Sequence, residues 1–502
     1  MRFVRVEVVS FSCYKYNMIA SLKLSKTHKE SRKKMELAGC NQPSINYFLS
    51  LLTKISSGYR GLLKLDDDIR KVSEKKVFLY EDIKLKDNTH KLGEANLGKV
   101  AVLKLNGGLG TSMGLHKAKS LLPVTEDGKT YIDLIITQIE SLRKDTGINI
   151  PLIFMNSFST QKDTLEYIRD NYPEFKNEGI GLDILQNKYP KLKTDTLMPA
   201  SHTNDQYNWS PPGHGDVYTV LYSSGILESM LLSGIKYLFV SNADNLAATI
   251  DSLILGFMIE NDVPFVMETA RRTESDKKGG HLAEDLKGNL VLRELANCSE
   301  DEVKNNFEDL ELWTDFNTNN IWIKLEALKD ILDKNNSIMP LDLIVNIKNN
   351  NSSSSATAED IVKVYQLETA MGSAIRYFPS ACAIRIDTNK RFFPTKKVSD
   401  LMLLLSDAVY YNDKGSLLLK NGREKPVIIL SSQYSTVQDL YELCPEGVPS
   451  LKLCNRLEIV GSVSFGANVE IKGFIKIINH TKNLFNISQG SVITEDIFVD
   501  QD

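Results

Sequence analysis

A glycine-rich segment is the first part of the chain whose residues could bind a phosphate group. Residues 105–114 read LNGGLGTSMG and follow the apolar run Val100–Leu105. The glycines let the backbone turn tightly and leave N–H groups free to face anionic oxygens. Two common nucleotide motifs do not fit: GxxxxGKS/T lacks its lysine, and GxGxxG has Met113 in place of its third glycine. Lys117 and Lys119 follow the loop and add positive charge.

A carboxylate that could hold a metal ion follows another apolar run. Asp244 lies in the segment SNADN, directly after Tyr237–Val240. At the end of a buried parallel strand beside phosphates, such a carboxylate is a natural ligand for Mg²⁺, which keeps several waters and takes further oxygens from phosphates. Capping of a helix N-terminus is the alternative role for Asp244. We favour metal binding.

A histidine is held between glycines in the segment PPGHGD, residues 211–216. The two prolines fix the approach of the chain, and Asp216 is expected to cap the helix that follows. A histidine at a helix start is well placed to contact a phosphate or a sugar. We therefore predict a binding role for His214 rather than a purely structural one.

Amide and carboxylate side chains form a further set of candidates. Gln186, in LQNKYP, offers the donor and acceptor that suit the edge of a uracil ring, although a lone glutamine is as often structural. Other segments carry groups of the kind that bind sugar hydroxyls. These segments are VME with Glu268, KGG with Gly280, NTNN with Asn319 and QLET with Glu368.

Together these segments resemble the eukaryotic-type UDP-glucose pyrophosphorylase family. The resemblance rests on KLNGGLGTSMG, LQNKYP, PPGHGD, SNADN and RFFPTKKVSDL, the last at residues 391–401. It runs from about residue 95 to the C-terminus, is weak over residues 36–95 and is absent from residues 1–34. The chain departs from the family pattern at His116–Ala118, and again where a lysine replaces threonine at Lys397.

The resemblance implies a role for each matched residue. Nucleotide contacts are expected from Leu105, Asn106, Gly107, Gly108, Lys119, Gln186, Gly213, Asp244 and Lys396. Sugar-phosphate contacts are expected from His214, Asn242, Glu268, Gly280, Asn319 and Glu368. Lys119 and Lys396 would be catalytic, and Asp244 would hold Mg²⁺ as the cofactor. The substitutions near the two lysines leave open whether Lys117 or Lys397 shares their roles.

The implied reaction joins UTP to glucose 1-phosphate, giving UDP-glucose and pyrophosphate. A phosphate oxygen of the sugar attacks the α-phosphorus of UTP in line. This nucleophile is already anionic near neutral pH, because the second ionisation of a phosphate monoester lies at about 6. No general base is then needed, and catalysis rests on positioning and charge stabilisation.

Other functions remain open at this point. A pyrophosphorylase with broader or different UDP-sugar specificity is the nearest alternative, although the LNGG opening favours the glucose enzyme. A catalytically silent scaffold of the same fold is disfavoured by the joint presence of Lys119, His214, Asp244 and Lys396. A hexapeptide acyltransferase is disfavoured by the short tail. Strictness for glucose, regulation and oligomeric state are not determined by the sequence.

The elements that must position these residues form an α/β fold. Short apolar runs, clearest at Val100–Leu105, Ile150–Met155, Tyr237–Val240 and Phe265–Met267, alternate with helical stretches such as Tyr131–Lys144 and Asp216–Ser233. This alternation predicts a central, mostly parallel sheet with helices on both faces, Rossmann-like, as in nucleotide-diphospho-sugar transferases. Ligands of such sheets bind outside the carboxyl ends of the strands.

The expected domain organisation has five parts. Residues 1–35 form a basic, disordered or solvated lead-in; 36–98 a helical region; 99–400 the catalytic domain; 401–452 a connection; and 453–502 a small left-handed β-helix. The prediction of a β-helix rests on apolar pairs about six residues apart with glycine corners at Gly461, Gly466 and Gly473. This tail is a candidate surface for homo-oligomer assembly. The run NNNSSSS at residues 349–355 is expected to be a surface loop.

Composition limits the partners and the compartment. A net charge of -4 and a pI of about 6.1 argue against nucleic acid or an acidic membrane surface as the main partner. The six cysteines are scattered without a CxxC pair, which favours reduced thiols and a cytoplasmic location. No apolar run reaches the roughly 18 residues of a spanning helix, so small-molecule substrates are the expected partners.

Overall fold

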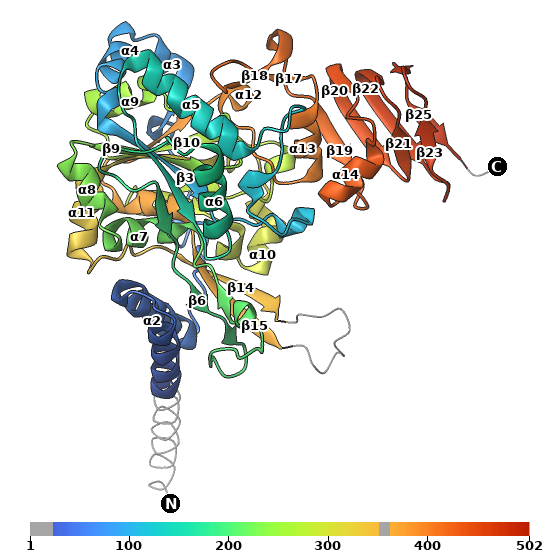
Figure 1. The fold of residues 1–502 in the computed structure, drawn as a ribbon. Coiled ribbons are helices and arrows are strands. Elements are labelled where there is room, and N and C mark those ends of the chain that lie inside the picture. The colour runs from blue at the N-terminus through green and yellow to red at the C-terminus, as the bar shows by residue number, and fades with distance from the viewer. Residues whose placement is uncertain (1–23, 351–361, 501–502) are drawn as a thin grey trace, which may run out of the picture.

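A large central sheet organises the molecule. The structure is a computed structural model that describes residues 24–350 and 362–500. Eight strands of its 11-stranded sheet lie in the order β2 (Val77–Leu79), β16 (Cys382–Arg385), β10 (Phe265–Arg271), β13 (Asp315–Lys324), β9 (Tyr237–Asn242), β3 (Val100–Asn106), β4 (Leu152–Asn156) and β5 (Asp183–Leu185) (Figure 1). All neighbours in this order are parallel except those of β13, which is antiparallel to both. The predicted mostly parallel sheet is confirmed.

Three further strands extend the sheet beside β13. They are β1 (Ile69–Arg70), β11 (His281–Asp285) and β12 (Leu290–Arg293), and they pair antiparallel, β11 with β1, β12 and β13. The hairpin β11–β12 brings Gly280 and Glu294, the residues that flank it, to adjacent positions, because His281 is paired with Arg293.

Helices cover both faces of the sheet, as the sequence predicts. On one face lie α5 (Tyr131–Thr146), α6 (Gln161–Asn171) and α9 (Ser252–Glu260), and on the other α7 (Val217–Ser223), α8 (Ile226–Leu232) and α11 (Leu325–Lys334) (Figure 1). β3 alternates between the two cores: Val102 packs toward α5, and Leu103 toward α7. Strands buried on both faces show no polar alternation, which explains the continuous apolar runs.

Short helices complete this body: α3 (Tyr80–Lys84), α4 (Asp87–Glu94), α10 (Glu300–Glu302), α12 (Thr388–Arg391) and α13 (Val398–Leu405). The stretch 216–233 was expected to be one helix and is instead α7 and α8. Gly225 separates them, with φ of 78° in the left-handed region that glycine tolerates. None of the described helices is long and apolar enough to cross a membrane.

The N-terminal region is a helical pair that packs on a small sheet. Residues 24–37 are helical, and α2 (Gln42–Ser56) follows. The expectation of a disordered lead-in is therefore wrong for residues 24–35, while residues 1–23 lie outside the described residues. One face of this helix is buried, at Thr27, Ser31 and Met35, which are spaced by four. Packing of these small or apolar residues orders the segment although its other residues are mostly basic. Lys34 Nζ also donates to the Ala200 carbonyl at 2.6 Å.

The partner of this helical pair is the sheet β14 (Leu343–Asn349), β15 (Lys363–Thr369) and β7 (Leu192–Lys193), with β6 (Tyr189–Pro190) and β8 (Trp209–Ser210) beside it. β14 contains Asn349, the first residue of the predicted NNNSSSS loop, and Asn350 is buried. The rest of that segment lies outside the described residues.

The C-terminal part is a stack of parallel strands that extends away from the body (Figure 1). One sheet contains β19 (Val427–Leu430), β20 (Ser450–Val460), β22 (Glu470–Asn479), β24 (Val492–Ile493) and β25 (Ile497–Val499), and a second β21 (Val463–Phe465) and β23 (Phe485–Ile487). The stack begins earlier than the predicted residue 453, because β19 pairs in parallel with β20. The hairpin of β17 (Val409–Tyr411) and β18 (Leu417–Leu419) precedes β19 in the chain, and α14 (Val437–Leu443) lies between β19 and β20.

Candidate active site

A lysine, a carboxylate and a backbone carbonyl meet at the carboxyl end of the central strands. β3 and β9 are parallel neighbours, so the loops that follow them leave the sheet at the same edge. Lys119 Nζ lies 2.6 Å from Asp244 Oδ2, and both side chains remain partly accessible, at 15% and 20%. Lys119 Nζ also donates to the carbonyl of Thr395, the residue before Lys396. Three predicted segments, far apart in the sequence, therefore converge.

The glycine loop lies against the predicted base-reading glutamine. A methyl group at Gly107 would come within 3.1 Å of Gln186 Oε1, so glycine at this position lets the loop backbone approach the amide. Gly110 has φ of 68°, and the Lys119 amide donates to the Gly108 carbonyl at 3.0 Å. The loop thus folds back on Lys119, with Leu105 and Asn106 as its last strand residues.

The PPGHGD segment closes against Gln186 on one side and β15 on the other. Gln186 Nε2 donates to the Gly213 carbonyl at 2.6 Å. Gly213 has φ of 80°, and a methyl group there would lie 2.4 Å from the Thr369 carbonyl oxygen. Glu368 precedes Thr369, and its Cβ would lie 3.1 Å from the same methyl group. Burial raises the pKa of Glu368.

The predicted cap role of Asp216 is wrong. Its carboxylate makes no capping hydrogen bond at the start of α7. It accepts instead from the Asn187 amide nitrogen at 2.7 Å and from Asn187 Nδ2 at 2.9 Å. Burial raises the pKa of Asp216 to about 6, although the hydrogen bonds from Asn187 act to lower this pKa. Asp216 therefore ties the PPGHGD segment to the residue after Gln186.

His214 is a neutral hydrogen-bond donor at physiological pH. Burial lowers its pKa to about 4. The Met371 amide donates to Nδ1 at 3.1 Å, so Nδ1 is the acceptor and Nε2 carries the proton. A fixed neutral imidazole can offer Nε2–H to an anionic oxygen without the cost of burying a second charge.

Glu268 does not fit the predicted sugar contact. Its side chain is 0% exposed, and Arg391 binds it twice, Nη2 to Oε1 at 2.6 Å and Nε to Oε2 at 2.8 Å. Trp322 Nε1 donates to Oε1 at 2.9 Å and Asn320 Nδ2 to Oε2 at 3.0 Å. A carboxylate has about four acceptor positions, so this one has none left for a ligand. Glu268 is part of a buried ion pair that holds β10, β13 and α12 together.

Gly280 lies near a carboxylate that the sequence analysis missed. A methyl group at Gly280 would come within 2.5 Å of Glu294 Oε2. Burial raises the pKa of Glu294, and Lys396 opposes the shift, which places the Lys396 charge near this carboxylate. Glu294 directly follows β12, so the rule of seeking polar residues after short apolar runs would have found it. The segment VLRE carried that signal.

Asn319 and Asn242 lie at strand positions that suit a ligand. Asn319 has φ of 61°, unusual for a residue with a side chain, and lies where the pairing of β10 and β13 shifts register. Asn317 Nδ2 donates to Asn319 Oδ1 at 2.8 Å and fixes that side chain. Asn242 ends β9 opposite Leu105 of β3. Its backbone therefore lies beside the glycine loop.

The segment that carries Lys396 is anchored from both ends. Asp400 Oδ2 accepts from the backbone amides of Lys396 at 2.7 Å and Lys397 at 2.8 Å. Asn245 Oδ1, one residue after Asp244, accepts from the Phe393 amide at 2.9 Å. Both lysine side chains are exposed. Burial raises the pKa of Glu294 and of Asp400, and the charge of Lys396 acts to lower the first while that of Lys397 acts to lower the second, so the two lysines face different carboxylates.

A buried lysine that the sequence analysis missed supports the Asp244 turn. Lys104 Nζ donates to Ser241 Oγ at 2.8 Å and to the Ala248 carbonyl at 2.6 Å. These two groups bracket the turn that presents Asp244. Burial lowers the pKa of Lys104 to about 7. Lys104 follows four apolar residues in β3, and only the partner strand shows what its side chain binds.

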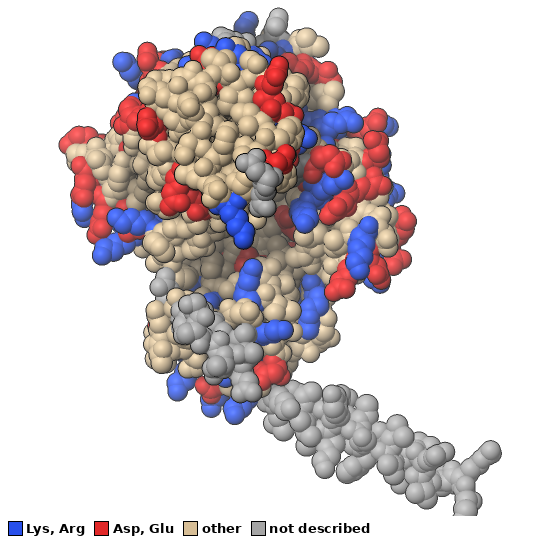
Figure 2. Space-filling view, turned by 90° about the vertical axis from the view of Figure 1, so that its right-hand side faces the viewer, with Lys and Arg blue, Asp and Glu red and all other residues tan. Residues whose placement is uncertain are grey.

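One carboxylate at this edge suits a metal ion that phosphates help to hold. Among residues 24–350 and 362–500, no group of three or more His, Cys, Asp or Glu side chains could hold an ion by itself. Asp244 offers a single carboxylate at this edge, and Mg²⁺ commonly takes one or two carboxylates together with phosphate oxygens and waters. Figure 2 shows a hollow on the face seen from the C-terminal stack, with Lys and Arg side chains along its lower rim. Such a rim favours anionic ligands.

Comparisons with known proteins agree with this geometry. A family model described as UTP–glucose-1-phosphate uridylyltransferase matches residues 45–472. The enzyme of that name from Encephalitozoon cuniculi is 39% identical over 404 residues, 80% of this chain and 77% of the relative. The one from Astragalus penduliflorus is 34% identical over 476 residues, 93% and 96% of the two chains.

Solved structures give the same result. UDP-glucose phosphorylase from Trypanosoma brucei superposes with a TM-score of 0.84 at 37% identity, covering 95% of this chain and 100% of that one. A Leishmania major UDP-glucose pyrophosphorylase mutant in complex with UDP-glucose gives 0.84 at 38% identity, covering 94% and 98%.

The fold and the site define the class: an α/β nucleotidyltransferase with the predicted phosphate-binding loops at the carboxyl ends of a largely parallel sheet. The matched length and identity also show which branch of this class is present. The chain belongs to the UTP–glucose-1-phosphate uridylyltransferase family.

Proposed function

We propose that this protein forms UDP-glucose and pyrophosphate from UTP and glucose 1-phosphate, reversibly. The observation that carries the proposal is the convergence of Lys119 Nζ with Asp244 Oδ2, at 2.6 Å, and with the Thr395 carbonyl beside Lys396. Two polyanions must approach each other in this reaction, and a site with two lysines and loop amides reduces their repulsion. The sugar phosphate is its own nucleophile, so no side chain has to remove a proton.

On the nucleotide side, Gln186 would read the uracil edge, held by its hydrogen bond to Gly213. Leu105, Asn106, Gly107 and Gly108 would line the base and phosphates, and Lys119 and Lys396 would bind the triphosphate. On the sugar side, His214 would donate Nε2–H to the sugar phosphate, and Asn242, Gly280, Asn319 and Glu368 would complete the contacts. We add Glu294 to this set and remove Glu268, because Glu268 has no free acceptor position.

Mg²⁺ is the proposed cofactor, and Asp244 is its protein ligand. When bound, the ion would neutralise charge on the phosphates. Other residues of the chain hold the Asp244 turn and the Lys396 segment in place. Lys104 and Asn245 fix the Asp244 turn, and Asp400 fixes the backbone at Lys396.

Further proposals concern the rest of the molecule. We propose that the C-terminal stack is a left-handed β-helix and a surface for homo-oligomer assembly, supported by its successive parallel pairings, Leu457 with Ile475 and Ile477 with Ile497. A cytoplasmic location is supported by the five described cysteines, all of them free. The substrates are small molecules, and we propose neither nucleic acid nor a membrane as partner.

The decisive experiment measures pyrophosphate release from UTP with glucose 1-phosphate, with and without Mg²⁺, alongside galactose 1-phosphate and N-acetylglucosamine 1-phosphate. Turnover only with the metal, and fastest with glucose 1-phosphate, is the expected result. A folded sample that releases no pyrophosphate with any of these sugars would refute the proposal. Preference for another sugar would refute the glucose assignment alone.

A further inference from the structure

The N-terminal helical pair packs against the residues that follow Gln186, the predicted base contact. In the turn before α2, Cys40 Sγ donates to the Lys188 carbonyl at 3.7 Å. Within α2, the ring centroid of Phe48 lies 5.1 Å from that of Tyr189, and both side chains are buried. The helical pair therefore supports the segment that carries Gln186 from behind.

Asn41, the N-cap residue of α2, also binds this segment. Its Oδ1 accepts from the Ser44 amide at 2.9 Å, as expected of an N-cap. Its Nδ2 donates to Asn187 Oδ1 at 3.0 Å, and to Ser223 Oγ at the end of α7 at 3.3 Å. The Asn41 amide thus accepts within α2 and donates to two elements outside it.

The orientation of both amides is fixed by partners that can play only one role. The carboxylate of Asp216 accepts, so Asn187 turns Nδ2 toward it, at 2.9 Å, and Oδ1 toward Asn41. The backbone amide of Ser44 donates, so Asn41 turns Oδ1 toward it and Nδ2 toward Asn187. Reversing either amide would place two donors or two acceptors face to face.

Asn187 in turn fixes Gln186 relative to the PPGHGD segment. Asp216 accepts from the Asn187 backbone amide at 2.7 Å, and Gln186 Nε2 donates to the Gly213 carbonyl at 2.6 Å. With Nε2 held by Gly213, Gln186 Oε1 would accept from the N3–H group of uracil. Cytosine has no hydrogen at N3, so the same oxygen would discriminate between the two bases.

We propose that Asn41 is a positioning residue for base recognition: its hydrogen bond to Asn187 holds Gln186 where Oε1 reads uracil rather than cytosine. The inference rests on the proposed function, with Gln186 as the base contact. A site that hydrogen-bonds one substrate rejects an analogue without the matching group only while its geometry is held. A displaced Gln186 would therefore lose discrimination between UTP and CTP.

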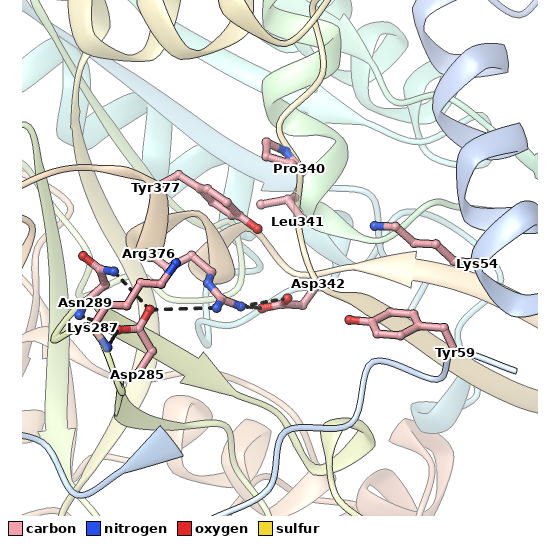
Figure 3. Close-up of a pocket in the computed structure, with 10 residues that line it drawn as sticks. All are labelled: Lys54, Tyr59, Asp285, Lys287, Asn289, Pro340, Leu341, Asp342, Arg376 and Tyr377. Atoms are coloured by element: carbon pink, nitrogen blue, oxygen red, sulfur yellow. Dashed lines mark hydrogen bonds and ion pairs between the residues drawn. The ribbon is translucent and has the colours of Figure 1, made fainter. Parts of the chain in front are cut away.

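The other end of α2 meets the body across a cavity. Lys54, and Tyr59 beyond the helix, line this polar cavity of about 380 Å³ together with Asp342 and Arg376 (Figure 3). Arg376 Nη1 lies 3.1 Å from Asp342 Oδ1, so these two side chains satisfy each other. The described residues that line the cavity include none from 186–189. The N-terminal end of α2 therefore carries the polar contact with the base segment.

Calorimetric titration of UTP and of CTP, with Mg²⁺ at pH 8 and without a sugar phosphate, tests the inference. Asn41→Asp keeps the N-cap oxygen but places a second carboxylate oxygen against Asn187 Oδ1. Asp216, whose pKa burial raises to about 6, is ionised at this pH and keeps the Asn187 amide from turning. We expect the ratio of the Kd for CTP to the Kd for UTP to fall at least about threefold.

Two further variants separate positioning from helix capping and from charge. Asn41→Ser keeps a capping oxygen without adding charge and should lower the same ratio, because it lacks the amide donor. The matched control, Asn46→Asp, makes the same chemical change on the exposed face of α2 and should leave the ratio unchanged. A role in capping alone would leave all three ratios equal to that of the natural protein.

An unchanged ratio in Asn41→Asp, with a far-ultraviolet circular dichroism spectrum like that of the natural protein, would overturn the inference. Should that variant not fold, an unchanged ratio in Asn41→Ser would do the same. An equal fall in Asn46→Asp would assign the effect to charge and also overturn it. A natural protein that binds UTP and CTP equally contradicts base reading by Gln186, and this inference with it, whereas one that binds neither contradicts the proposed function itself.

Discussion

Replacing Glu268 by glutamine distinguishes a structural role of this carboxylate from a role in binding the sugar. The change keeps the size of the side chain and removes the charge that Arg391 binds through two hydrogen bonds. It also places an amide NH₂ where Trp322, Asn320 or Arg391 now donates, so two donors would face each other. Arg391 would retain the Thr249 carbonyl at 3.0 Å and Asp251 at 3.4 Å.

The expected cost follows from burial. Breaking a fully buried ion pair by removing one partner costs about 3–5 kcal/mol, because the other charge stays desolvated. For a chain of this size each kcal/mol lowers the melting temperature by about 1 °C, so the expected drop is about 3–5 °C. Below both melting temperatures, the KM for glucose 1-phosphate should stay within about twofold of the natural protein, because Glu268 does not reach the ligand.

The assay combines thermal unfolding, followed by circular dichroism, with initial-rate kinetics at 20 °C. Midpoints are compared rather than extrapolated free energies, since a chain with several folding units need not unfold in two states. An unchanged midpoint together with a tenfold higher KM for glucose 1-phosphate would refute the structural role and restore Glu268 as a sugar ligand.

The remaining predictions concern the site itself. Glu294→Gln should give the opposite pattern to Glu268→Gln, a raised KM for glucose 1-phosphate with little change in melting temperature; a large loss of stability without a KM change would contradict it. Lys396→Ala should lower kcat at least a hundredfold, whereas Lys397→Ala should lower it less than tenfold; equal losses would show that the two lysines share the role. The pKa of His214, lowered to about 4 by burial, makes the unfolded chain bind more protons between pH 6.5 and 4, so this residue removes stability as the pH falls through that window. His214→Gln should flatten that part of a plot of melting temperature against pH, and an unchanged slope would contradict the buried neutral state.

Local pattern was enough to predict the sheet and the loops at its edge. Apolar runs buried on both faces predict β3, β4, β9 and β10, and the loops that follow β3 and β9 carry Lys119 and Asp244. The reason is physical: parallel strands end at one edge, so residues that follow separate strands meet there whatever their distance in the sequence. Helix α5 was predicted nearly to its ends, since Gly147 terminates it with a positive φ.

Only the tertiary structure decided the roles that depend on which groups surround a side chain. Glu268 is bound by Arg391, 123 residues further on, and Asp216 is bound by Asn187. Glu268 was therefore not free to bind a sugar, and Asp216 was not free to cap a helix, as their own segments suggested. The helix at residues 24–37 likewise exists because Ser31 and Met35 find a buried face to pack against. A sequence shows which groups a residue can offer; the contacts that use those groups are made by distant segments, and these became visible only in the folded chain.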